Sequence, residues 1–436
     1  MNADAPVPCT ANQVMVARLQ AQGYVSNIPF LLRAKGPLCP ATLRDALQLV
    51  VDRHAVLRSV LAETDDGLVQ APVRGVSVAL PLTDVSAEAD PLAAALAHIA
   101  ADGAQAFGLS DPLRLRGGLF RLAAGDHLVG IIVDHLAADG VSLGIIAAEW
   151  RSFYQAIAAG TPFDVPLIAP QYRDFAAWQR AWLQSGEAEQ QRRFWIDALA
   201  GIPSRAVSGG GAYAAERLAF ELDPQTSQSL AALCVRLRVK PFAAVLALYA
   251  LLLFAVTGER DLVIGTVRAN RRRADTAAMV GHFANLIPLR VRIAEQQTLE
   301  MFVRDVASVC AAAYAHDALP FPEVAAALWR AARIPASRLA EFSINFVPFP
   351  DDGVGWGDGL RMAQIWGLIS DRPQATSRVT LFIRQQRSAI GGTLVYDRRT
   401  LDPAWAASFP ERFGAMIAQF AGGAVPTVGA MLAELG

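Results

Sequence analysis

The sequence predicts an α/β protein built from two halves. Short apolar stretches typical of buried strands alternate with longer stretches in which apolar residues recur at helical spacing. This order appears once before and once after two stretches without periodicity, GTPFDVPLIAP (Gly160–Pro170) and SRAVSGGGA (Ser204–Ala212), which we interpret as connectors. We therefore expect an N-terminal half over residues 1–170 and a C-terminal half over residues 171–436.

The first half is expected to alternate strands and helices up to a polar loop. A β-rich stretch to about Thr83 lies inside this order. The expected elements are a strand at Ile28–Arg33, a helix at Pro40–Arg53, a helix at Pro91–Ala106, strands at Leu115–Leu122 and Leu128–Val133, and a helix from about Ser142 onward.

The second half is expected to repeat this kind of order. Its most apolar stretch, Phe242–Val256, is shorter than the roughly 18 uninterrupted apolar residues of a membrane span, so we interpret it as a buried helix. The expected elements are strands at Arg217–Leu222, Asp261–Thr266, Leu286–Val291, Phe342–Val347 and Gly391–Tyr396, and helices at Pro241–Val256 and Leu299–Tyr314.

The bulk composition excludes partner classes that depend on charge. Lys plus Arg number 39 and Asp plus Glu number 40, so no charge excess favours nucleic acid or an acidic membrane surface. The four cysteines have neither metal-ligand spacing nor a CxxC pair, which is typical of reduced thiols. No basic segment followed by an apolar one marks the start as a secretion signal. We expect a cytoplasmic protein without a metal site.

The loop DHLAADG (Asp134–Gly140) is the strongest candidate for chemistry. It lies where an apolar strand ends and a helix begins, and α/β proteins place functional groups at such strand ends. His135 could take a proton from an attacking nucleophile, because imidazole titrates near neutral pH. The alternative is a structural histidine whose ring bonds a neighbouring backbone group.

Asp139 in the same loop has two interpretations. Asp before Gly is common in turns, where the carboxylate accepts backbone N–H bonds or pairs with a cation. Direct participation in catalysis is the other interpretation, and we favour the scaffold.

The loop and several further motifs resemble one family. DHLAADG is similar to the HHxxxDG signature of condensation domains of nonribosomal peptide synthetases, in the chloramphenicol acetyltransferase-like superfamily. Other motifs follow in the family's order over about residues 10–420. They are TANQVMVARL (Thr10–Leu19), RHAVLR (Arg53–Arg58), YRDFAAWQR (Tyr172–Arg180), FWIDALAG (Phe194–Gly201), DLVIGTVRANRRR (Asp261–Arg273), VGHFANLIPLRVRI (Val280–Ile293) and HDALPFPEV (His316–Val324).

The resemblance implies a fold and a set of site residues. Two acyltransferase-like halves would form a V-shaped pseudo-dimer with an active-site tunnel between them. His135 would orient or deprotonate the nucleophile, Asp139 would be structural, and the backbone N–H of Gly140 would lie near the tunnel. Arg271 is our choice for the ion-pair partner of Asp139, with Arg272 and Arg273 as alternatives. Asn345 would face the tunnel or bond a neighbouring strand.

Asp134 departs from the family's signature, which has a first histidine there. We expect a supporting role that adds negative charge beside His135 and raises the pKa of its imidazole. The same letters also fit DxxxxDxxS, the signature of heterocyclization domains, although GHFANLIPLR resembles the ordinary condensation form. A non-catalytic recruiting domain is a third interpretation.

The function implied by the resemblance is acyl transfer in nonribosomal peptide or hybrid polyketide biosynthesis. The donor would be an acyl or peptidyl thioester on the phosphopantetheine of a carrier protein, and the acceptor a small amine or alcohol, giving an amide or an ester. We expect no cofactor bound by the chain itself, no nucleic acid or membrane partner, and a stand-alone monomer.

Overall fold

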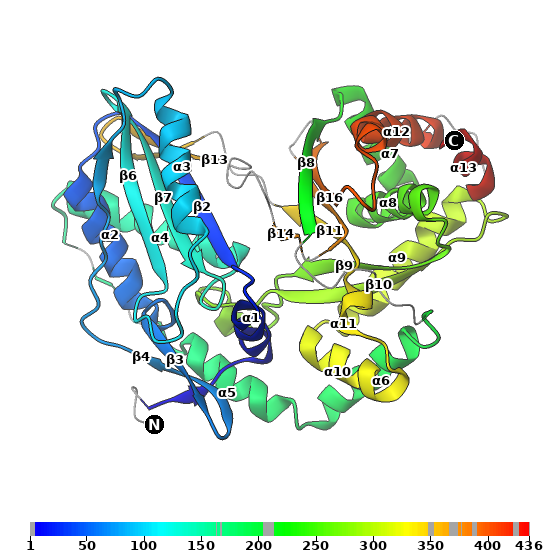
Figure 1. Cartoon of the computed structure of the whole chain (residues 1–436), viewed down its shortest axis with the longest axis horizontal. Helices are drawn as coiled ribbons and strands as arrows, with labels where there is room; N and C mark the ends of the chain where they lie inside the picture. The colour runs from blue at the N-terminus through cyan, green and yellow to red at the C-terminus, as the bar shows by residue number, and fades with distance from the viewer. Residues whose placement is uncertain are drawn as a thin grey trace. The chain divides into compact units, whose positions relative to one another are not determined.

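The computed structural model describes residues 5–162, 164–165, 168–203, 213–347, 353–365, 374–375, 377–385, 390–421 and 427–435. Within it the chain forms two compact units, each drawn from three segments (Figure 1). Unit 1 comprises Met1–Ala188, Ala269–Ala284 and Pro350–Asp371. Unit 2 comprises Glu189–Arg268, Asn285–Phe349 and Arg372–Gly436.

Each of these units combines segments that are distant in the sequence, whereas the two halves predicted from the sequence are continuous. The division between residues 170 and 171 stays a prediction. The connector predicted at Ser204–Ala212 lies outside the described residues.

Unit 1 is built on a mixed β-sheet. Its described strands follow the order β12-β13-β2-β7-β6-β5, in which β2, β7 and β6 are antiparallel neighbours. The strands are β2 (Asn27–Lys35), β5 (Leu82–Asp84), β6 (Leu115–Ala123), β7 (Asp126–Asp134), β12 (Val354–Gly357) and β13 (Leu360–Ile365). β12 and β13 come from late in the chain, and β13 extends the sheet by pairing with β2, with Arg361 opposite Lys35.

Helices cover both faces of this sheet (Figure 1). On one face α2 (Pro40–Arg53) and α4 (Gly140–Ala158) enclose a core with the inward side chains of β2 and β7. On the other face α3 (Pro91–Gly103) packs through Ala95 and Ile99. In a sheet with one open face, every second side chain of β7 would face solvent. The strand is instead buried from His127 to Asp134, because both faces of the sheet are covered.

The rest of unit 1 comprises a second, smaller sheet and further helical segments. A second sheet pairs β4 (Gly67–Pro72) with both β1 (Val7–Pro8) and β3 (Ser59–Thr64). The further helical segments are α1 (Ala11–Ala21), η1 (Ala55–Arg58), α5 (Tyr172–Trp182) and η2 (Ala274–Thr276). Helix α1 begins at Ala11 because Thr10 and Gln13 form a capping box.

Unit 2 also combines a sheet with helices. Its described strands follow the order β10-β9-β11-β15-β16-β8-β14. They are β8 (Tyr213–Glu221), β9 (Asp261–Arg268), β10 (Asn285–Arg292), β11 (Phe342–Val347), β14 (Gln374–Ala375), β15 (Val379–Gln385) and β16 (Ile390–Asp397). The helices are most of α6 (Gly186–Ala198), α7 (Pro224–Leu237), α8 (Pro241–Thr257), α9 (Leu299–Ala315), α10 (Phe321–Ala332), α11 (Ala336–Leu339), α12 (Pro403–Ala421) and α13 (Val428–Leu435).

Helix α8 is the apolar segment that the sequence predicted to be a buried helix, and this prediction is confirmed. It begins with Pro241 in its first turn and ends at Gly258, whose left-handed φ of 69° suits a glycine. Every residue from Ala243 to Leu253 is buried. No single helix in the described part of the chain has the length and apolarity to cross a membrane, and only α7 and α8 taken together, bent by 109°, meet that criterion.

Candidate functional site

The DHLAADG loop connects strand β7 to helix α4 in unit 1. Asp134 is the last residue of β7 and Gly140 is the first of α4. The loop is therefore fixed at one end by a central strand and at the other by a helix N-terminus. Such a position holds side chains in place while leaving the loop backbone free to approach a substrate.

Asp139 caps helix α4 and ties the loop to residues 281–284. Its Oδ1 accepts hydrogen bonds from the backbone N–H of Ser142 at 2.8 Å and from the Ser142 hydroxyl at 2.8 Å. Its Oδ2 accepts bonds from the backbone N–H groups of Phe283 at 3.0 Å and Ala284 at 3.1 Å. The carboxylate is buried, and these contacts are those of a scaffold residue.

Arg271 lies against Asp139, so the ion pair expected from the sequence is present. Its Nη2 is 3.3 Å from Asp139 Oδ1 and 2.8 Å from the Ser142 hydroxyl. Its Nη1 donates to the carbonyls of Thr276 and Met279 at 2.5 and 2.6 Å. Arg273, one alternative partner, pairs with Asp275 instead.

His135 is half-buried and held by the loop that contains it. Its Nδ1 lies 2.9 Å from the carbonyl oxygen of Ala138. A carbonyl oxygen can only accept, so this contact favours the tautomer in which Nδ1 carries the proton and Nε2 carries the lone pair. Among the residues that the structure describes, none is hydrogen-bonded to Nε2.

His282 is a site residue that the sequence did not single out. Its Nδ1 lies 2.8 Å from Nδ1 of His135, and the two rings meet edge-on at 68° with centroids 4.5 Å apart. Burial, together with the neighbouring His135, lowers the pKa of His282 to about 3. The only signal in the sequence was a titratable residue inside the apolar stretch VGHFANLI.

The carboxylate of Asp134 forms a buried ion pair. Its Oδ2 is 3.1 Å from Nη1 of Arg114, and its Oδ1 accepts from the Gln20 amide and the Leu136 backbone N–H, each at 3.1 Å. Arg114 also donates to the carbonyls of Ser59, Gly108 and Leu109. The negative charge expected beside His135 is therefore paired with Arg114, and its effect on His135 stays a prediction.

Two glycines near the loop differ in what surrounds them. A Cβ added to Gly140 would meet no atom within 4 Å, so open space lies beside the first turn of α4. A Cβ on Gly281 would come within 2.0 Å of the Tyr172 ring, whose hydroxyl donates to the His282 carbonyl at 2.7 Å. Gly281 is thus required by packing, whereas Gly140 is not.

Asn345 belongs to unit 2, on strand β11. Its Oδ1 accepts a hydrogen bond from the backbone N–H of Val267 at 3.0 Å. This contact gives the side chain the strand-bonding role that was one of its two interpretations. Its role toward a substrate stays a prediction.

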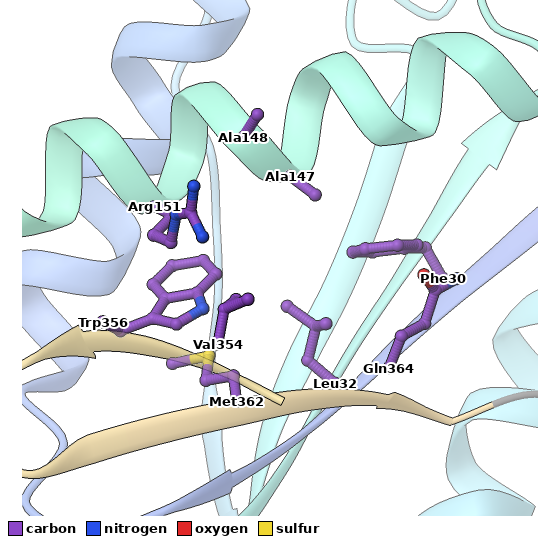
Figure 2. A pocket seen from close by; sticks show the side chains of 9 residues that line it. All are labelled: Phe30, Leu32, Ala147, Ala148, Arg151, Val354, Trp356, Met362 and Gln364. Atoms are coloured by element: carbon purple, nitrogen blue, oxygen red, sulfur yellow. The ribbon is translucent and has the colours of Figure 1, made fainter. Parts of the chain in front are cut away.

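A pocket of about 200 Å³ lies in unit 1 beside helix α4 (Figure 2). It is lined by Phe30, Leu32, Ala147, Ala148, Arg151, Val354, Trp356, Met362 and Gln364. Trp356 is buried and packs edge-on against Trp150 at 81° and Tyr154 at 65°. This tryptophan therefore anchors the late strands β12 and β13 on α4.

The described residues contain no group of three or more His, Cys, Asp and Glu side chains that could hold a metal ion. What the loop offers is a half-buried imidazole whose Nε2 is available as a base, next to a helix N-terminus whose dipole favours developing negative charge. This arrangement can remove a proton from a nucleophile that attacks a carbonyl. The roles of the individual residues stay predictions.

The chain is similar to known proteins over most of its length. Residues 5–359 match the family model described as Condensation domain. The N-(5-amino-5-carboxypentanoyl)-L-cysteinyl-D-valine synthase of Amycolatopsis lactamdurans is 30% identical over 434 residues, which are 94% of this chain and 11% of that protein. The chain thus spans about a tenth of the length of this relative.

Two solved structures are similar in fold. The first condensation domain of the calcium-dependent antibiotic synthetase, in complex with a substrate analogue, is 22% identical with a TM-score of 0.81, and the match covers 98% of each chain. The X-domain in its complex with OxyB from teicoplanin biosynthesis is 25% identical with a TM-score of 0.82, covering 99% of this chain and 98% of that one. The predicted fold class, an α/β chain of two acyltransferase-like halves, is confirmed.

Proposed function

Because the chain belongs to the condensation-domain family of nonribosomal peptide synthetases, we propose that it transfers an acyl or peptidyl group from a carrier-protein thioester to an amine or a hydroxyl. The product is an amide or an ester. The donor arrives on the phosphopantetheine arm of the carrier protein, so this arm is part of the substrate and the chain needs no bound cofactor of its own.

The observation that supports the proposal most directly is the tautomer of His135 that its contacts favour. Its Nδ1 is occupied by the Ala138 carbonyl, at 2.9 Å, which leaves the lone pair of Nε2 to accept a proton. In the proposed reaction the acceptor's nitrogen or oxygen attacks the thioester carbonyl while Nε2 removes its proton. The tetrahedral intermediate then collapses, the C–S bond breaks, and the departing thiolate takes the proton back.

The start of helix α4 is our proposed site for the negative charge of that intermediate. Asp139 caps the N–H of Ser142, and among the described residues no acceptor is bonded to the N–H of Gly140. Open space beside Gly140 would let a carbonyl oxygen approach this N–H. Preorganised backbone donors of this kind typically contribute several kcal/mol to acyl transfer.

A second candidate is a recruiting domain that binds a partner protein without catalysis. The X-domain of teicoplanin biosynthesis, which was solved in a complex with OxyB, is among the similar structures. The replacement of the family's first signature histidine by Asp134 is compatible with this function. Heterocyclization is a third candidate, but the burial of Asp134 against Arg114 argues against direct contact of this carboxylate with a substrate.

We place the reaction in the cytoplasm. The four cysteines, Cys9, Cys39, Cys234 and Cys310, are free thiols, which supports a reducing compartment.

The test incubates the purified protein with an acyl-loaded carrier protein and a mixture of amines and alcohols, with products weighed by mass spectrometry. An amide or ester is expected, and His135→Ala should lower turnover on the order of 10²–10⁴-fold. His98→Ala, an exposed histidine on α3, is the matched control and should keep wild-type turnover.

Each rival function predicts another product. A ring formed from Cys, Ser or Thr would favour heterocyclization. An inactive wild-type protein that nevertheless binds a partner would favour recruitment. Wild-type turnover in a folded His135→Ala protein would contradict the assignment of His135 as the base.

A further inference from the structure

We infer that His282 is a positioning residue, whose ring nitrogen Nδ1 accepts a hydrogen bond from the Nδ1–H of His135 and thereby keeps the lone pair of His135 on Nε2. The inference rests on the proposed function, because it assigns His282 a role through His135. It concerns a contact between two residues 147 positions apart, both in unit 1.

The two Nδ1 atoms are close enough to share a hydrogen bond. At 2.8 Å the two Nδ1 atoms require one proton between them, since two N–H groups or two lone pairs facing each other would repel. Nδ1 of His135 also lies 2.9 Å from the carbonyl oxygen of Ala138. If His135 carries the proton, both neighbours accept from it, so this assignment satisfies the Ala138 contact as well.

The surroundings of His282 keep its ring neutral, so that it can act as an acceptor. The side chain is 5% exposed, and burial is the main cause that lowers its pKa to about 3, followed by the charge that His135 would carry. Asp139, together with the carbonyls of Ala138 and His135, opposes this shift only in part. The other ionisable groups around this segment are Arg271, which is paired with Asp139, and Tyr172.

Three contacts hold the backbone around His282 and so fix the position of its ring beside His135. Tyr172 donates its hydroxyl hydrogen to the His282 carbonyl at 2.7 Å. The next backbone N–H, that of Phe283, donates to Asp139 at 3.0 Å. The preceding residue, Gly281, packs directly on the Tyr172 ring. Asp139 therefore holds both the His135 loop and the segment that carries His282.

This contact has a consequence for the proton that His135 takes up. When Nε2 gains a proton, the Nδ1–H of His135 becomes part of a cation, and its hydrogen bond to the neutral ring of His282 becomes stronger. The contact therefore stabilises His135 with its proton on Nδ1 and its lone pair on Nε2, both before and after Nε2 takes up the proton. Removing the acceptor should leave the Ala138 carbonyl alone to hold this tautomer.

The test compares His282→Phe with His282→Asn. Phenylalanine keeps a ring of similar size without an acceptor, whereas the side-chain oxygen of asparagine can accept near the place of Nδ1. We expect His282→Phe to lower kcat about 10-fold or more, by less than His135→Ala. His282→Asn should restore most of the kcat.

Nitrogen NMR of protein labelled with ¹⁵N-histidine gives a readout that needs no turnover. The six histidine rings are assigned through the loss of signals in the His135→Ala and His282→Phe variants. The wild type should show a proton on Nδ1 of His135 and a neutral His282 ring between pH 5 and 8. In His282→Phe the share of His135 that carries its proton on Nε2 should rise.

The outcomes separate this inference from the proposed function. If the wild-type protein forms no product, the proposed function fails, while the NMR titration still decides whether His282 accepts from His135. If His282→Phe keeps the wild-type kcat and the wild-type tautomer of His135, the inference is overturned. A proton found on Nε2 of His135 in the wild type would overturn it as well, even if the phenylalanine variant does not fold.

Discussion

Asp134 and Arg114 form an ion pair inside unit 1, with Oδ2 and Nη1 3.1 Å apart and the two side chains 0% and 1% exposed. The pair links the last residue of β7 to the residue that precedes β6. Arg114 in turn holds the loop carbonyls of Gly108 and Leu109. The replaced signature position is therefore part of a buried network that supports the end of β7.

We expect Asp134→Asn to lower the free energy of unfolding and to leave turnover largely unchanged. The substitution leaves the Arg114 guanidinium buried without a counter-charge, which typically costs on the order of 3–5 kcal/mol of unfolding free energy. Denaturant unfolding measures this loss. The folded fraction should keep most of its turnover and its pH profile, because Asp134 does not contact Nε2 of His135.

The control for this prediction is Asp126→Asn. Asp126 pairs with Arg33 at 2.7 Å, but the side chains are 20% and 36% exposed, so the loss should be within about 1 kcal/mol. If Asp134→Asn is as stable as the control and has lost its turnover, Asp134 acts in catalysis. Release of an open amide in place of a wild-type ring would favour heterocyclization.

A second prediction concerns Asp139 and Arg271. Asp139→Ala removes the cap of α4, the carboxylate that pairs with Arg271, and the acceptor of the N–H groups of Phe283 and Ala284. We expect a loss of about 3–5 kcal/mol and a lower melting temperature, with turnover lost because the loop shifts. Differential scanning calorimetry and the product assay measure the two effects.

Asp45→Ala removes an exposed carboxylate that pairs with Arg44 and serves as the control, with little expected change. An inactive Asp139→Ala protein that melts at the wild-type temperature would show that the carboxylate acts directly in the reaction.

The local elements could be predicted from the sequence because their signals are local. Helix α2 was predicted at Pro40–Arg53, where it is found, because Pro40 and the spacing of apolar residues mark it. Strand β11 was likewise predicted at Phe342–Val347. Helices such as α7, with a less apolar sequence, were not predicted as separate elements.

The arrangement of distant segments could not be predicted in the same way. Pairing of β13 with β2 depends on strands that lie at opposite ends of the sequence, and no periodicity reports it. The same reason applies to the contact of His282 with His135 and to that of Arg114 with Asp134. Arg271 was placed beside Asp139 through the family resemblance, since spacing alone did not distinguish it from its neighbours.

The neutral His282 predicts a dependence of stability on pH. Its pKa is about 3 in the folded chain against an ordinary value of 6.5, so between these values the unfolded chain binds more protons. The free energy of unfolding is therefore not reduced by His282 above about pH 6.5, and it decreases as the pH falls from 6.5 toward 3. At pH 5 the loss should be about 2 kcal/mol.

Unfolding free energies at pH 7.5 and pH 5 for the wild type and His282→Phe measure this effect. The wild type should lose more stability on acidification than the variant, which has no group to protonate at this position. Equal losses in the two proteins would show that His282 is not held neutral by the fold.

The last prediction compares alanine substitutions at the two glycines beside the loop. One should affect turnover and the other should affect folding. Gly140→Ala places a methyl group where no atom lies within 4 Å, so the protein should fold with an unchanged or slightly higher melting temperature. Turnover should nevertheless fall, because the methyl group narrows the approach to the N–H proposed to bind the oxyanion. Gly281→Ala would bring its Cβ to 2.0 Å from the Tyr172 ring and should reduce the soluble yield. Melting curves and kcat values for the two variants measure the contrast, and a folded Gly140→Ala protein with wild-type kcat would place the oxyanion elsewhere.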